Sequence, residues 1–239
     1  MHNVCYYYFL LLQTEKLKRI KDMMKRVIGV VAITLIAFAC SKSDDSNPGT
    51  GGGATDNFNR AAMLTNIADN IIIPAYQDFS TDINSLVTAK DNFVATPNQS
   101  NLDELRTAWY NAYKTWQHLE MFNIGKAEEI QYSFKMNVFP TNTSDIENNI
   151  TSGTYDLATV NNNDAVGFPA IDYMLYGVAN DDASIITTYS NSNYKNYLSD
   201  VVNQMQSLTN MVYTDWTSSY RDTFIASTEN TASSAVNKL

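Results

Sequence analysis

Two carboxylates and a tyrosine are the residues of this chain best suited to hold a ligand. Asp172 and Tyr176 are four positions apart, so a helix would place both on one face. Glu120 belongs to an earlier segment. Hard cations prefer oxygen ligands, and a helical bundle can direct carboxylates into its interior from facing helices. We therefore expect Glu120, Asp172 and Tyr176 to form a metal- or ligand-binding site, with the two carboxylates facing each other across the bundle.

Each of these residues also has a purely structural explanation. The helix dipole favours a carboxylate such as Asp172 near a helix N-terminus, and Glu120 can be a solvated residue at a helix end. Most buried tyrosines only find a hydrogen-bond partner. His118, beside Glu120, is the one histidine outside the amino-terminal region. A lone histidine on an amphipathic helix is more often a boundary residue than a ligand.

The segment 167–177 (GFPAIDYMLYG) has the punctuation of a short helix. Proline suits the first helical position, where its missing N–H is not needed, and glycine suits the left-handed position just past the end. We therefore expect Pro169 to start the helix and Gly177 to end it. Asp172 and Tyr176 lie between these two boundaries.

This segment resembles the signature of the imelysin-like proteins, a Gly-x-His-x-x-Glu motif that runs into an apolar turn. Gly167 matches the glycine, Pro169 stands at the position of the histidine, and Asp172 at that of the glutamate. Trp116 and Glu120 are similar to the family's Trp-x-x-x-Glu segment. The resemblance implies two related helical bundles packed together, of which this chain is the first half, and a role near iron acquisition.

The proline at the histidine position bears on function. A hydrolytic zinc site needs about three protein ligands and an open position for water. Pro169 supplies no ligand, so a non-catalytic binding protein is the first hypothesis, with iron or another divalent cation as its ligand. The alternatives are a metallopeptidase, the activity for which the family is named, and a lipoprotein that binds an envelope protein.

The body of the chain has the composition of an all-α protein. Strand-rich domains need many turn residues, whereas glycine occurs at only four positions after residue 56. Apolar residues recur at helical spacing over 58–94, 100–122 and 194–220, which predicts long helices. A shorter helical piece is expected at 128–138 and a short turn at 145–150, with 156–164 irregular. The expected fold is an up-down helical bundle.

Individual residues predict where these helices bend and end. Pro74 lies inside the first long helix and removes a backbone hydrogen bond, so we expect a kink there. Ser100 followed by Asp103 resembles a capping box, and Gly125 is expected to end the same helix. Trp109 falls on the apolar stripe of that helix and is expected to lie in the core.

The amino-terminal region has the features of a bacterial lipoprotein signal. A basic start at 24–26 precedes an apolar run, Val27–Ala39, that is shorter than a membrane-spanning helix. The run ends at Cys40, in a sequence that resembles a lipobox, so Cys40 is the expected lipidation site. An uncleaved anchor helix is the alternative.

Three regions follow from this pattern. Residues 1–40 form the signal and lipobox region, with the true start expected at Met23 or Met24. Residues 41–56 form a Gly-rich flexible tether, and residues 57–239 form an imelysin-like helical domain that we expect to be truncated at its C-terminus. A short acidic run after Cys40 points to the outer membrane, so the expected partners are the membrane, through the lipid, and a metal ion or an envelope protein.

The charge balance argues against nucleic acid as a partner. The chain has a formal net charge of −9, and its basic residues are concentrated before the apolar run. The remainder is therefore more acidic than the whole chain, whereas nucleic-acid binding needs basic patches that neutralise phosphates.

Overall fold

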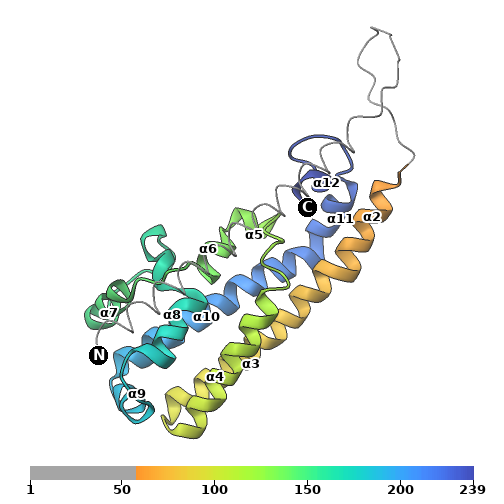
Figure 1. The fold of residues 1–239 in the computed structure, drawn as a ribbon. Coiled ribbons are helices and arrows are strands. Elements are labelled where there is room, and N and C mark those ends of the chain that lie inside the picture. Colours follow the sequence, from red (N-terminus) through yellow and green to blue (C-terminus); the bar gives the residue numbers. More distant parts are fainter. Residues whose placement is uncertain (1–57) are drawn as a thin grey trace, which may run out of the picture. The chain divides into compact units, whose positions relative to one another are not determined.

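The computed structural model describes residues 58–239, so the signal, lipobox and tether predictions lie outside the described residues. Three long helical segments form the framework. They are α2 (Arg60–Ile67), η1 (Ala68–Ile72) and α3 (Ile73–Ala95); then α4 (Gln99–Trp116); and finally α10 (Ser192–Asp215), η4 (Trp216–Tyr220) and α11 (Arg221–Ala226). Helix α3 packs against both α4 and α10, and both run antiparallel to it (Figure 1). No strand occurs in residues 58–239, and the predicted all-α, up-down bundle is confirmed.

Short elements fill the connection between α4 and α10. In chain order they are α5 (Lys126–Glu129), α6 (Tyr132–Met136), α7 (Thr143–Ser152), η2 (Val160–Ala165), α8 (Gly167–Asp172), η3 (Tyr173–Gly177) and α9 (Asp182–Thr188). The segment predicted as one helical piece at 128–138 forms two, because Gln131 adopts a left-handed backbone conformation between them. The segment expected to be irregular, 156–164, contains most of the 3₁₀ turn η2.

The predicted disturbance at Pro74 is associated with a π-helical turn. Residues 68–72 form this turn, and Pro74 is the second residue of α3 directly after it. Proline has no N–H to donate back to the preceding turn, and a π-helical turn is a common way for a helix to absorb such a local mismatch.

Two predicted boundaries of α4 were wrong. Asn98, not Ser100, caps the helix: its side-chain oxygen accepts the backbone N–H of Asn101 at 2.9 Å. Asparagine in extended backbone is as good a cap as serine, and it comes two residues earlier. At the other end, α4 stops at Trp116 rather than near Gly125, and the chain continues in turns to residue 121.

The final segment also differs in detail from the expectation. The last predicted helix, 194–220, is continued in the structure to residue 226. Helix α11 ends at Ala226, and after a loop only the short helix α12 (Ala235–Lys238) follows. No helix of residues 58–239 is long and apolar enough to cross a membrane.

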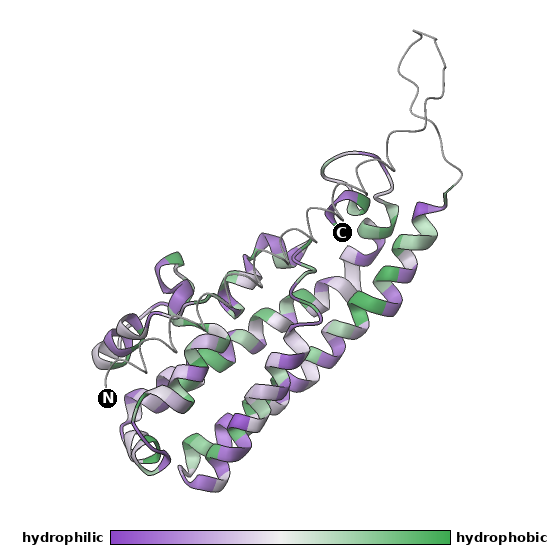
Figure 2. Ribbon diagram, in the orientation of Figure 1, coloured by the Kyte–Doolittle hydropathy of each residue, from purple (hydrophilic) through white to green (hydrophobic). Residues whose placement is uncertain are grey.

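An aromatic cluster in the core connects the short elements to the bundle. The Trp116 ring lies 5.6 Å from that of Phe79 and 5.3 Å from that of Tyr132, and Phe168 lies 6.2 Å from Phe79. These rings come from α4, α3, α6 and α8, and all are buried. Polar and apolar residues alternate along the long helices, as expected when each buries one face (Figure 2). Helix α8 is thus fixed against the bundle by its apolar side chains.

Candidate functional site

Gly167 brings α8 into direct contact with α6. It adopts a φ of +74°, and a Cβ atom at this position would lie 2.2 Å from the carbonyl oxygen of Met136. A larger residue is therefore excluded both by backbone conformation and by space. Helix α8 begins at Gly167, so Pro169 is its third residue rather than its first. It still lies in the first turn, where no intrahelical partner is required for its nitrogen.

Gly177 has a different role from the one predicted. It is not among the residues of the range 58–239 with positive φ, so its assignment to a left-handed C-terminal position was wrong. Instead, a Cβ atom at Gly177 would lie 2.6 Å from Cδ2 of Tyr173. The glycine leaves room for this ring, and the chain passes through the π-helical turn η3 before it leaves the helix.

A pocket of about 470 Å³ lies along α8 and η3. Aromatic residues dominate its walls. The Trp109 and Tyr113 rings are stacked at 5.5 Å, and Tyr113 meets Phe168 edge to face at 5.2 Å. The indole N–H of Trp109 donates to the Phe168 carbonyl oxygen at 3.1 Å, which ties the wall formed by α4 to α8. The pocket is lined by Trp109, Tyr113, Asn137, Phe139, Thr141, Phe168, Pro169, Asp172, Tyr173, Tyr176 and Gly177.

The structure brings two of the three predicted site residues together. Asp172 and Tyr176 both line the pocket. Glu120 does not; it approaches through Asn137, whose side-chain amide donates a long hydrogen bond of 3.5 Å to the glutamate. His118 is exposed and is not among the lining residues. That these residues bind a ligand remains a prediction.

The Asp172 carboxylate has no counter-charge within the described chain. Asp172 is exposed, and its partial burial against the pocket raises the pKa of its carboxyl above the usual value. No hydrogen bond or ion pair joins Asp172 to any other residue of the range 58–239. A negative charge is therefore presented to the pocket without an internal cation to balance it.

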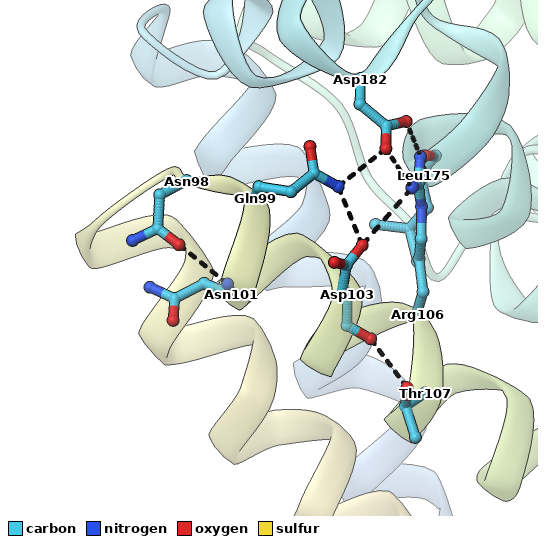
Figure 3. Close-up of polar contacts among 8 residues, drawn as sticks. All are labelled: Asn98, Gln99, Asn101, Asp103, Arg106, Thr107, Leu175 and Asp182. Atoms are coloured by element: carbon cyan, nitrogen blue, oxygen red, sulfur yellow. Dashed lines mark hydrogen bonds and ion pairs between the residues drawn. The ribbon is translucent and has the colours of Figure 1, made fainter.

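Arg106 lies beside Tyr176 at the border of the pocket. Its charge is balanced by Asp182 (Figure 3). Its guanidinium lies 4.3 Å from the centre of the Tyr176 ring. Nη1 and Nη2 donate to the two carboxylate oxygens of Asp182 at 3.0 and 2.8 Å, and Nε and Nη2 donate to the Leu175 carbonyl oxygen at 3.2 and 2.8 Å. These hydrogen bonds from Arg106 lower the pKa of Asp182. Arg106 therefore holds η3 in place and is neutralised by Asp182, not by Asp172.

The Glu147 carboxylate lies outside the pocket and anchors one of its lining residues, Tyr173. Glu147 of α7 accepts hydrogen bonds from the hydroxyls of Tyr173 at 2.9 Å and Tyr194 at 2.6 Å. Burial, with a further contribution from Glu147, raises the pKa of Tyr173 to about 12. Tyr173 thus enters the pocket wall as a neutral, anchored phenol.

Several pocket residues were not predicted from the sequence. Trp109 was assigned to the core, yet it is only half-buried and forms a wall of the pocket. Phe139 is 85% exposed at the pocket, in a loop whose position depends on tertiary packing. Trp109 lies on a regular helical stripe, so the spacing of residues alone does not distinguish it from a core residue.

The predicted cation site is not completed by the described residues. Within residues 58–239, no three His, Cys, Asp or Glu side chains lie close enough together to hold a metal ion. Hard divalent cations in proteins are held by about six or more oxygen ligands, some of which are water. The pocket provides a single carboxylate, Asp172, so its residues alone do not make up such a ligand set.

Comparisons with known proteins show what this chain is similar to. A curated protein, "Iron-regulated protein A" of Synechococcus elongatus, is 26% identical over 84 residues, which are 33% of this chain and 24% of that protein. A crystal structure of a protein from Parabacteroides distasonis, described as an iron-regulated protein A precursor, has a TM-score of 0.63 at 22% identity. The match covers 80% of this chain and 57% of that one, and it shows the fold.

The chain therefore spans about a quarter of the curated relative and rather more than half of the solved one. The family model described as Imelysin matches residues 72–239, which include every described residue of the pocket and of the motif-like segment. With the helical architecture and the motif geometry in agreement, this chain belongs to the imelysin family.

Proposed function

We propose that this chain is a non-catalytic, envelope-anchored binding protein with a role in iron acquisition, and that it binds its ligand in the pocket along α8 and η3. The pocket itself is the observation that carries the proposal. Its volume of about 470 Å³ suits a small molecule, and its apolar walls surround a small number of polar groups. Such a composition is typical of a site that recognises a ligand.

The lining residues favour binding over hydrolysis. Zinc-dependent hydrolysis requires about three protein ligands and a position for water. Asp172 is the one carboxylate in the pocket wall described here, and Pro169 occupies the position at which the family motif has histidine. Peptidase activity, which the family's name suggests, has no assembled donor set in residues 58–239.

The proposed link to iron and to the envelope has separate support. Both relatives are described as iron-regulated protein A, and this chain matches only part of the length of each. The lipobox-like sequence ending at Cys40 supports a lipid anchor, and the acidic residues after it support an outer-membrane location. We propose on this basis that the protein captures its ligand at the envelope surface or in the periplasm.

The proposed function is tested by measuring iron uptake in cells from which the gene has been deleted. Cells complemented with the native chain should recover uptake under iron limitation, whereas cells carrying Asp172→Ala should not. Glu104→Ala is the matched control, because Glu104 is an exposed carboxylate of α4 outside this pocket. Equal uptake with and without the gene would refute the iron role. Chelator-sensitive cleavage of a protein substrate by the purified chain would refute the non-catalytic assignment.

A further inference from the structure

We infer that the ligand of this pocket is a small organic cation with an apolar body, held by the Asp172 carboxylate and the surrounding aromatic rings. The inference rests on the proposed function, because it takes the pocket to be a binding site. It goes further by naming the chemical class of the ligand, and it replaces the bare metal ion that the sequence led us to expect.

The charge of the pocket is the first argument. Asp172 is the only ionised group among the eleven described residues that line it; none of them is a lysine, arginine or histidine. Arg106, the cation at the border, already donates to both oxygens of Asp182 and to the Leu175 carbonyl. A carboxylate that lines an aromatic pocket and lacks a cationic partner there is stabilised by a ligand that brings a positive charge.

The rings are the second argument. Six of the eleven lining residues are aromatic, and a ring face attracts a cation, by up to about 2 kcal/mol when the contact is desolvated. One such contact exists at the border, where the Arg106 guanidinium lies over Tyr176. Trp109 is held by the Phe168 carbonyl and Tyr173 by Glu147, so these two walls are fixed before a ligand arrives. Fixed aromatic rings around a single carboxylate therefore favour an organic ammonium ion as the ligand.

The size of the pocket is the third argument. A bare metal ion would leave most of the 470 Å³ empty and would find a single carboxylate ligand. A neutral apolar molecule would fill the volume but would leave Asp172 dehydrated and without a counter-charge, which is unfavourable. An organic cation satisfies both requirements.

A pair of probes with the same shape and different charge tests this inference. Choline carries a quaternary ammonium, and 3,3-dimethylbutan-1-ol is its neutral analogue with carbon in place of nitrogen. Titration of the complete chain by calorimetry, with tryptophan fluorescence as a second readout, should show saturable binding of choline at least about tenfold tighter than that of the alcohol. Asp172→Asn should weaken choline binding by about tenfold or more, because it removes the charge and keeps the shape. Glu104→Gln should leave the affinity unchanged, and thermal unfolding should show that both variants are folded.

The other outcomes separate this inference from the proposed function. If the alcohol binds as tightly as choline, or if Asp172→Asn binds choline like the native chain, the charge inference is wrong although the pocket still binds a ligand. If neither probe binds, the inference is overturned, and the uptake experiment alone decides the proposed function. Saturable binding of ferrous ion that depends on Asp172 would overturn the inference while supporting the link to iron.

Discussion

Replacing Arg106 by lysine tests how η3 is held in place. The substitution keeps the positive charge but removes the planar fork that contacts Asp182 and the Leu175 carbonyl at the same time. Loss of the bond to the buried Leu175 carbonyl costs about 1 kcal/mol. Loss of the two-pronged contact with Asp182 adds little to this cost, because the Asp182 side chain is 41% exposed.

The contact with the Tyr176 ring adds about 0.5 kcal/mol, so Arg106→Lys should lower the free energy of unfolding by about 1.5 kcal/mol. Urea denaturation followed by circular dichroism measures this value, and the denaturant dependence should stay unchanged. Because Leu175 and Tyr176 belong to η3, the same variant should also weaken ligand binding in the pocket.

Arg221→Lys is the matched control for this experiment. Arg221 makes a comparable two-pronged contact with Asp69, at 2.6 and 2.7 Å, but neither residue lines the pocket. This variant should lose less stability than Arg106→Lys, because its ion pair is largely solvated, and it should bind ligand normally. The reasoning is refuted if Arg106→Lys is no less stable than Arg221→Lys, or if the two variants affect the pocket equally.

Three further predictions concern Gly167, Glu147 and Asp69. Gly167→Ala should destabilise the fold by about 3 kcal/mol or more in urea denaturation, because the added Cβ atom would lie 2.2 Å from a backbone carbonyl oxygen. Gly153→Ala is the control and should cost about 1 kcal/mol: its φ is similar, but the atom nearest to an added Cβ is 3.6 Å away. Equal losses would contradict the steric explanation. Glu147→Gln should lower the pKa of Tyr173 from about 12 only part of the way toward its ordinary value, because burial is the larger cause of the shift. Ultraviolet absorbance titration measures this pKa, and an unchanged pKa would exclude the Glu147 carboxylate as a cause. Hydrogen bonds from Arg221 lower the pKa of Asp69, so the Asp69 carboxylate stabilises the fold fully above its ordinary pKa of 3.8 and ceases to do so as the pH falls through the lowered pKa. Asp69→Asn should therefore flatten the stability–pH profile between about pH 5 and 2, measured by urea denaturation. An unchanged profile would contradict the assignment.

The long helices were predictable because their stability depends on a repeated pattern. Apolar spacing over many turns averages out local exceptions, so α3, α4 and α10 were identified with their buried faces. Their boundaries were less predictable. Asn98 and Ser100 are both good caps, and the choice between them depends on the backbone conformation of the preceding loop.

Two of the three predicted site residues come together in the structure, for a physical reason. Asp172 and Tyr176 are neighbours in sequence, so they share a face even though the chain between them becomes π-helical. The position of Glu120 was extrapolated from Trp116 as if α4 continued. The helix ends at Trp116, and Glu120, in the turns that follow, is exposed and does not line the pocket. The aromatic walls depend on contacts between distant segments, which spacing in the sequence does not contain.

The crossing of α8 over the end of α6 has a consequence for how the family signature is interpreted. Gly167 is required because two backbones touch, and this requirement is the same whether the position two residues later carries an imidazole or a pyrrolidine ring. The glycine of such a signature therefore indicates how the helices pack, whereas the side chain two residues later determines which ligand atoms that position can offer. Proteins selected by the glycine and its apolar surroundings alone would share this crossing of α8 over α6, whichever side chain stands two residues later.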